Sequence, residues 1–354
     1  METSTTARAR KFTYFIGIDV SKNELDYAII HEKKLLFHRE CKNDPDAILA
    51  FVTELKSLPQ FTMTRALFCM EDTGFYCNHL IHTLKKLKAI VVVENPYHLK
   101  HSSGMIRGKD DKRDSIRIAQ YAKKNSDELK LWKERRPVVS QLVNLFTIRN
   151  RLVGLSVALN SPLKEQDAFI KKKWSDQSIQ LCRRSTDAMK LDLTAIDSAI
   201  DHLINSDERL KKLKMLITSV PFVGPVTAIS IIICTGEFTE IQNPKKFACY
   251  AGIAPFKNES GKSIAKPKIS RIANRKMKAL LHTCAIAAKA RDEELNAYYE
   301  RKIKEGKAKM VVINAVRYKL ILRIFACVKQ DRCYIKGYVD YRAKTAAVCP
   351  AGDV

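Results

Sequence analysis

The sequence has no cysteine pair in C-x-x-C spacing and no cysteine–histidine cluster with zinc-site spacing, although it contains 10 cysteines. Several of them lie inside apolar runs such as ALFCM and ISIIICT. This pattern favours reduced core thiols of an intracellular protein over a disulfide framework. An apolar leader is missing from METSTTARARKF, and no run of about 18 apolar residues follows it. We therefore expect a soluble protein that does not enter a membrane.

Acidic residues are scarce relative to basic ones, with 38 Asp and Glu against 63 Lys and Arg, which gives a net charge of +25. Such an excess indicates a polyanionic partner, nucleic acid before a membrane surface. The length of 354 residues and the hydrophobic fraction of 46% predict more than one folded unit. We expect an acidic-site domain over 1–136, a helical hairpin over 137–212, a second domain over 213–335 and a tail over 336–354.

The first part of the chain has the pattern of a mixed α/β domain. Short strands are predicted at 14–20, 25–30 and 35–40, joined by tight turns into an antiparallel meander. Asp44 and Pro45 provide the N-cap and first residue of a helix. Further strands at 65–71 and 89–94 alternate with helices. A meander followed by alternating helices and strands predicts a ribonuclease-H-like α/β fold.

Carboxylates occur at the ends of these apolar strands, where ligands and chemistry commonly sit in α/β sheets. Asp19 ends the first strand, and Glu71 ends the fourth. The segment RGKDDKRDSIRIAQYA then begins an amphipathic helix in which Asp111 and Asp114 share a face, while Asp110 and Asp114 share one almost as well. Either pair, added to Asp19 and Glu71, would make a cluster of hard oxygen ligands. Such a cluster is suited to Mg²⁺ or Mn²⁺ and to phosphodiester displacement.

The middle of the chain is poor in glycine and proline and has apolar residues at helical spacing. We expect one helix that ends before Pro162, a loop at KKKWS, and a second helix from about Ser185 to Asn205. This pattern fits either a coiled-coil dimerisation arm or a simple helical linker.

The second domain has a basic loop that contains a serine. Between residues 257 and 278 the sequence has eight Lys and Arg and one acid, and Ser260 precedes Gly261 there. A hydroxyl attacks a phosphodiester only when it is activated beside charge-stabilising groups, and a cationic loop meets part of that need. Upstream, the turn SVPFVGP resembles a helix-hairpin-helix phosphate site, although Phe222 stands where a glycine is usual. Helices are predicted from about Asn274 and over 311–328.

Several of these segments together resemble a known family. FIGIDVSKNELDYAI, MEDTGFY, NPYHLKH, KDDKRDSIRIAQYA, VPFVGPVTA, FACYAGIAPFKNESG and ISRIANRKMKALL follow one another from about residue 13 to about residue 328. In this order they are similar to the DEDD transposases of an insertion-sequence family. That family also contains the Piv-type DNA invertases and the bridge-RNA-guided recombinases.

The resemblance implies a RuvC-like domain with an acidic tetrad, a coiled coil, and a C-terminal transposase domain with a catalytic serine. The tetrad would be Asp19, Glu71, Asp111 and Asp114, and the serine would be Ser260. The chain departs from the family pattern at Asp110, where threonine is usual, and at Ser115, where alanine is usual. The implied cofactor is Mg²⁺ (or Mn²⁺). The implied partners are donor and target DNA, a structured guide RNA, and further copies of the chain in a dimer or tetramer in the bacterial cytoplasm.

Basic residues around both segments are candidates for holding nucleic acid. They are Arg107, Lys109, Lys112, Arg113, Lys257, Lys262, Lys266, Lys268, Arg271, Arg275 and Lys276. Three other functions remain open on the residues alone. They are a site-specific invertase, a metal-dependent nuclease or junction resolvase without serine chemistry, and a non-enzymatic nucleic-acid binder.

Overall fold

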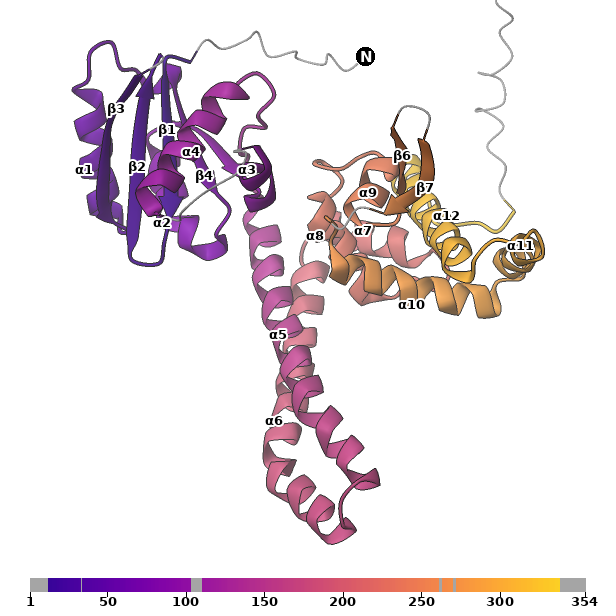
Figure 1. The fold of residues 1–354 in the computed structure, drawn as a ribbon. Coiled ribbons are helices and arrows are strands. Elements are labelled where there is room, and N and C mark those ends of the chain that lie inside the picture. The colour runs from indigo at the N-terminus through magenta and orange to yellow at the C-terminus, as the bar shows by residue number, and fades with distance from the viewer. Residues whose placement is uncertain (1–11, 33, 103–109, 261–262, 270–271, 338–354) are drawn as a thin grey trace, which may run out of the picture. The chain divides into compact units, whose positions relative to one another are not determined.

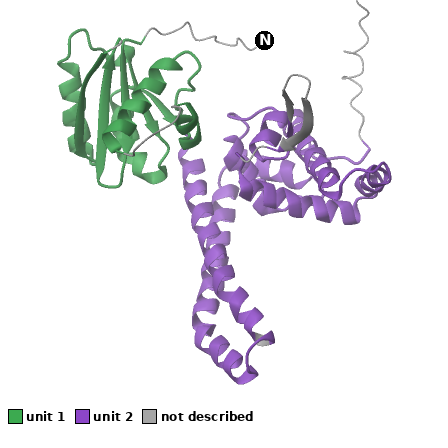
Figure 2. Ribbon diagram, in the orientation of Figure 1, with its two compact units in different colours: residues 1–134 green, residues 135–354 purple. Residues whose placement is uncertain are grey.

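A computed structural model describes residues 12–32, 34–102, 110–260, 263–269 and 272–337 (Figure 1). The side chains of residue 167 and of the residues from 257 to 268 lie outside that description. The chain divides into two compact units, residues 1–134 and 135–354 (Figure 2). The finer division of the second unit at residues 212 and 335 stays a prediction.

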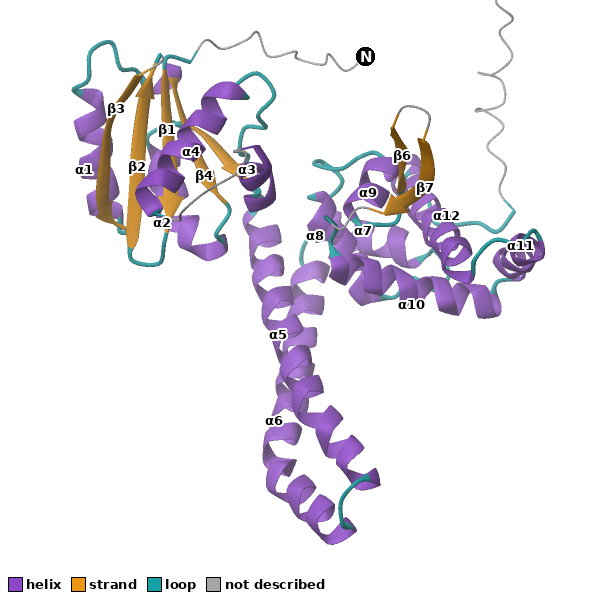
Figure 3. Ribbon diagram, viewed as in Figure 1, coloured by secondary structure: helices purple, strands orange, loops and turns teal. Residues whose placement is uncertain are grey.

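The first unit contains a five-stranded mixed sheet in the order β3-β2-β1-β4-β5 (Figure 3). The strands are β1 Tyr14–Val20, β2 Glu24–His31, β3 Lys34–Lys42, β4 Ala66–Glu71 and β5 Ile90–Glu94. The first three form an antiparallel meander, and β4 and β5 run parallel to β1. The predicted mixed α/β fold, a meander followed by alternating helices and strands, is therefore confirmed.

Helices cover both faces of this sheet. The helical segments are α1 Pro45–Lys56, α2 Asn78–Lys86, α3 Pro96–Ser102 and α4 Asp111–Lys124, with short 3-10 turns at Met63–Arg65 and Gly74–Cys77. One core lies between the sheet and α1 and α2. The other lies between the sheet and α3 and α4. As predicted, Asp44 caps α1, since its Oδ1 accepts a hydrogen bond of 2.9 Å from the Ala47 amide.

Helix α4 crosses β1 at very short range, and Gly17 permits this approach. A Cβ atom at Gly17 would lie 2.1 Å from the Ala119 nitrogen and 2.2 Å from the Ser115 carbonyl oxygen. Both atoms belong to the backbone of α4, so they cannot move aside without moving the helix. Gly17 thus sets the height of α4 above the sheet, and with it the position of the first turn of α4.

Gly17→Ala should destabilise the first unit by about 1–3 kcal/mol, because α4 must be displaced. The measurement is urea unfolding followed by Trp132 fluorescence in a Trp174→Phe background, since the chain has 2 tryptophans and Trp132 packs against the core of the first unit. Gly154→Ala is the control, because no atom lies within 4 Å of the added Cβ. It should leave the Trp132 transition unchanged. An unaltered transition in Gly17→Ala would show that α4 is not held at this contact.

The second unit begins with a helical hairpin of α5 Pro137–Glu165 and α6 Lys172–Asn205. The prediction was wrong on the break between them. Pro162 lies inside α5, and α6 starts at Lys172 within KKKWS, well before Ser185. Pro162 lacks the amide hydrogen that would bond to the preceding turn, and α5 continues for only three residues beyond it. Packing between α5 and α6 then extends both helices beyond their local sequence preference.

Helix α5 is long and apolar enough to cross a membrane by length and composition alone. However, α6 packs along it, and Arg149 on α5 forms an ion pair with Asp197 on α6, with 2.5 Å from Nε to Oδ1. A helix that makes such contacts with a charged partner is not a convincing membrane span.

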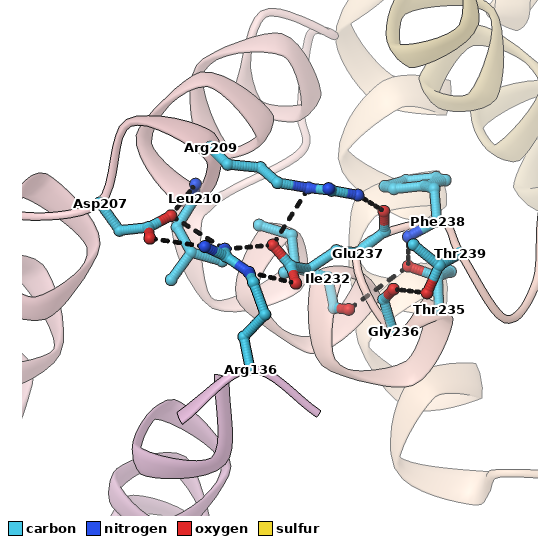
Figure 4. A network of polar contacts seen from close by, with 10 residues as sticks. All are labelled: Arg136, Asp207, Arg209, Leu210, Ile232, Thr235, Gly236, Glu237, Phe238 and Thr239. Atoms are coloured by element: carbon cyan, nitrogen blue, oxygen red, sulfur yellow. Dashed lines mark hydrogen bonds and ion pairs between the residues drawn. The ribbon is translucent and has the colours of Figure 1, made fainter. Parts of the chain in front are cut away.

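A polar network fixes the start of α5 to the rest of the second unit (Figure 4). The Arg136 guanidinium donates to Asp207 Oδ2 at 2.8 Å and to Glu237 Oε2 at 3.0 Å. Arg209 also pairs with Glu237, at 3.2 Å from Nε to Oε1. Glu237 is 8% exposed, so two guanidinium groups compensate one buried carboxylate. The network makes the base of the helical hairpin continuous with the helical body.

The helical body contains α7 Glu208–Thr218, α8 Pro225–Thr235, α9 Pro244–Tyr250, α10 Arg275–Arg291, α11 Glu293–Lys304 and α12 Lys309–Gln330 around one core. The stretch from Asn274 through Leu295, where one helix was predicted to start at about Asn274, contains two helices, because Asp292 ends α10 and caps α11. Phe222, in the turn between α7 and α8, has φ of 69°, the left-handed conformation that favours glycine.

The described cysteines, which are all except Cys349, are free, as predicted.

Candidate active site

Three neighbouring strands of the sheet end in carboxylates on the face covered by α4. Asp19 follows Gly17, which touches α4, at the next position on that face of β1. Glu71 and Glu94 end β4 and β5 and stand opposite each other in the parallel register. Because side chains alternate along a strand, all three point to the side on which α4 lies.

The first turn of α4 adds two more carboxylates to this edge. Burial raises the pKa of Asp19 to about 6, and the next causes are the charges of Asp111, Asp114 and Glu71 in that order. Asp111, Asp114 and Glu71, the other residues predicted for the tetrad, are therefore each close enough to repel Asp19. Asp110, the N-cap of α4, is exposed and makes no side-chain capping bond.

The donor set fits a hard divalent cation, because crowded carboxylates are stabilised when an ion replaces their mutual repulsion. Within the described residues, however, no three His, Cys, Asp or Glu side chains are grouped closely enough to hold an ion as they stand. One cause is visible, since Arg117 Nη1 donates to Asp114 Oδ1 at 2.6 Å. This i,i+3 pair occupies one oxygen of Asp114.

Asp19→Asn should stabilise the metal-free protein at pH 8, measured as thermal unfolding in EDTA. The pKa of the folded carboxyl, about 6, exceeds the value in an unfolded chain, so ionisation of Asp19 opposes folding as the pH rises through 6. We expect a gain of about 1–2 kcal/mol at pH 8, after allowance for solvent screening, that disappears near pH 4. Asp110→Asn, at the exposed N-cap, should give no gain in stability at either pH. A gain that is equal at both pH values would contradict the electrostatic origin.

Ser260 lies in the second unit and is the last residue of β6 Pro255–Ser260, which pairs with β7 Ser263–Ile269. The prediction of an irregular loop is therefore wrong, because this stretch forms an antiparallel hairpin in which Ser260 pairs with Ser263. Whether such a polar stretch forms a loop or a hairpin depends on the pairing between its two halves, which single-residue propensities do not encode. The role of Ser260 as a nucleophile stays a prediction.

Both ends of this hairpin are fixed at its base. The Asn274 amide donates to the Tyr250 carbonyl at 2.9 Å, and Asn274 Nδ2 donates to the Tyr250 hydroxyl at 2.8 Å. Gly252 has φ of 64°, and a Cβ there would meet Ala273 Cβ at 2.4 Å. The chain segments that enter and leave the hairpin are thus in direct contact, which restricts the hairpin's orientation.

The predicted nucleic-acid residues fall into two groups. Lys112 and Arg113 on α4, and Arg275 and Lys276 in the first turn of α10, are exposed and able to contact phosphates. The others lie outside the described residues or have side chains that lie outside them: Arg107, Lys109, Lys257, Lys262, Lys266, Lys268 and Arg271.

Sequence comparison matches both units to one class of protein. Residues 16–166 match a family described as DEDD transposase of the IS110 type, and residues 214–300 match the transposase family IS116/IS110/IS902. Both matched stretches are thus transposase domains of the IS110 type.

The chain is 26% identical over 328 residues to the pilin gene-inverting protein of Moraxella bovis, covering 91% of this chain and 98% of that one. The protein of the same name from Moraxella lacunata matches with the same identity and coverage. An insertion element IS110 protein of 43.6 kDa from Streptomyces coelicolor is 29% identical over 145 residues, or 40% of this chain and 36% of that one.

Glu94 and Arg117 are site residues that the sequence argument did not select. Glu94 ends an apolar strand, AIVVVE, as Asp19 and Glu71 do, so the same criterion would have found it. Arg117 stands three residues after Asp114, a spacing that predicts an ion pair on a helix.

Proposed function

We propose that this chain is a DNA transposase or recombinase that cuts and rejoins DNA with a metal-binding carboxylate site and a serine nucleophile. The observation that supports it most is the coupling of Asp19 to Glu71, Asp111 and Asp114 at one edge of the sheet. These residues come from three distant segments of the transposase domain, and their repulsion has no benefit for folding. A cost of this kind is typical of functional sites.

In this proposal Asp19, Glu71, Asp111 and Asp114 bind Mg²⁺ (or Mn²⁺). The ion would supply stabilisation of negative charge on the attacking and leaving oxygens of a phosphodiester. Arg117 occupies one oxygen of Asp114, and its release would free that oxygen for the ion and the guanidinium for a DNA phosphate. Lys112 and Arg113, exposed in the same turn, would hold the backbone beside the cut.

Ser260 is proposed as the nucleophile of the second unit. Its Oγ forms a bond to phosphorus while the bond between phosphorus and the 3′ oxygen breaks. The proton lost by the hydroxyl is balanced by the proton that the 3′ oxygen takes up. The products are a 5′-phosphoserine link and a free 3′-hydroxyl, and attack by a 3′-hydroxyl on that link reverses the step and rejoins DNA.

The proposed partners are donor and target DNA, a structured guide RNA, and further copies of the chain. The net charge of +25 suits two nucleic acids. Leu155, Leu181 and Leu191 on the helical hairpin are 60%, 77% and 73% exposed, which favours its use as a dimer or tetramer contact in the bacterial cytoplasm.

Site-specific inversion is the second candidate. Its support is the match over 98% of the Moraxella bovis pilin gene-inverting protein. The DNA that flanks the gene separates the two: element ends with a structured non-coding stretch favour transposition, and invertible repeats favour inversion.

The test uses purified full-length protein, Mg²⁺, DNA that contains the junction of the flanking element ends, and RNA transcribed from the adjacent non-coding stretch. The proposal expects cleaved and rejoined products that require protein, metal and DNA. Products that form equally well without the RNA would remove the guide from the proposal. DNA binding with no cleavage under any metal condition would overturn it in favour of a non-enzymatic binder.

A further inference from the structure

Glu94 is the third carboxylate in the row formed by β1, β4 and β5, and its environment differs from that of Asp19. It stands opposite Glu71 in the parallel register and faces α4, and its side chain is 16% exposed. Like charges opposite each other in a sheet destabilise the pair unless something compensates them. Glu94 therefore needs partners, and the structure supplies them from other segments.

The two oxygens of Glu94 are already engaged. Oε2 accepts a hydrogen bond of 3.1 Å from the Tyr121 hydroxyl on α4. Oε1 accepts one of 2.9 Å from the Asn95 amide and lies 2.9 Å from His98 Nδ1 on α3. A carboxylate has about four acceptor positions, so three contacts leave little capacity for an ion. This arrangement suits a residue that holds other groups in place.

Tyr121 is the contact that connects Glu94 with the tetrad. It stands seven residues, or about two turns, after Asp114 on the same face of α4. Burial and then the Glu94 charge raise the pKa of Tyr121 to about 12, so the phenol remains a protonated donor at neutral pH. The contact of Gly17 with Ser115 and Ala119 fixes the height of α4, and the bond from Tyr121 to Glu94 fixes its rotation.

We propose that Glu94 is a positioning residue of the carboxylate site, which holds α4 through Tyr121 so that Asp111 and Asp114 face Asp19 and Glu71. The inference rests on the proposed metal-dependent function. It assigns to Glu94 the task of orienting the ligands without itself binding the ion. Partners that orient ligands in this way commonly change metal affinity by about 10–100-fold when they are removed.

The experiment is a Mg²⁺ titration of full-length protein without nucleic acid, in which the rise of Tm with Mg²⁺ reports binding. Wild type should respond, and Asp111→Asn should not. Glu94→Ala and Tyr121→Phe should raise the Mg²⁺ concentration at the midpoint of this titration by about tenfold. Glu94→Gln, whose amide oxygen still accepts a hydrogen bond, should remain within about twofold of wild type. Tyr97→Phe on α3 is the matched control and should not change the midpoint.

Each outcome decides one question. If Glu94→Gln loses as much affinity as Glu94→Ala, Glu94 is an ion ligand and the inference is overturned. Wild-type midpoints in Glu94→Ala and Tyr121→Phe would overturn it as well. Tm in EDTA identifies variants that fail to fold. If Glu94→Ala fails to fold, the midpoint of Tyr121→Phe, which loses only one oxygen, decides whether the inference holds. If wild type and Asp111→Asn respond alike, the proposed metal site itself is wrong, which is a different result from a failure at Glu94 alone.

Discussion

Asp111→Ala should abolish DNA strand cleavage, with a loss of about 10³-fold or more, while its neighbour Asp110→Ala should keep most of it. The reason lies in the charges that act on Asp19 and in the position of each residue relative to the start of α4. After burial, the charge of Asp111 contributes most to the raised pKa of Asp19, and the charges of Asp114 and Glu71 follow. Asp110 stands in extended backbone, with φ of −159° and ψ of 127°, before the helix begins.

The measurement compares single-turnover cleavage of one DNA substrate by both variants at saturating Mg²⁺. Either change removes an acidic group near the start of α4, which costs each of them about 0.3–1 kcal/mol of helix stability. Asp111→Ala also removes one of the charges that repel Asp19, so Tm in EDTA is measured for both variants to compare their stabilities. Full activity in Asp111→Ala together with loss in Asp110→Ala would mean that the ligand position lies one residue earlier.

Local rules predicted the first unit well because each of its elements is encoded by nearby residues. Asp44 and Pro45 start α1 where the capping rule places it. The apolar run before Asp19 forms β1, the central strand, which has buried residues on both faces. Carboxylates at the ends of such strands stand out against apolar neighbours, and this made Asp19 and Glu71 recognisable.

The second unit was predicted less well, because long-range pairing decides its details. KKKWS has the composition of a loop but begins α6, where packing along α5 supports it. The residues around Ser260 are polar and basic, but they pair as β6 and β7. In the first unit, no local pattern shows that Gly17 lies beneath α4, since a glycine in a strand predicts a bulge as readily as a close contact.

Ser260→Ala should abolish the covalent protein–DNA adduct, whereas Ser263→Ala should retain it. The two serines stand opposite each other in the β6–β7 hairpin, so they share its basic surroundings and its fixed base. Loss of the nucleophilic oxygen leaves no group to form the phosphoserine link. The adduct is measured as radiolabelled DNA that remains bound to denatured protein, and DNA binding before denaturation should be unchanged in both variants.

Metal-dependent cleavage that survives in Ser260→Ala, with no adduct in wild type, would instead identify a nuclease or junction resolvase that uses the carboxylate site alone. An adduct that persists in Ser260→Ala and disappears in Ser263→Ala would move the nucleophile across the turn. Both results would leave the carboxylate site intact, because Asp111→Ala tests that site independently.

The same variants test whether the serine and the carboxylates act from different subunits. In a dimer whose sites combine Ser260 of one copy with Asp111 of the other, mixing Ser260→Ala with Asp111→Asn creates some complete sites. Half of randomly mixed dimers are mixed, and one of their two sites is complete, so about a quarter of wild-type adduct should return. Sites built within one chain would recover nothing, since each copy lacks one of the two groups. Recovery would therefore make assembly a condition of catalysis, because a single copy could not cut DNA on its own.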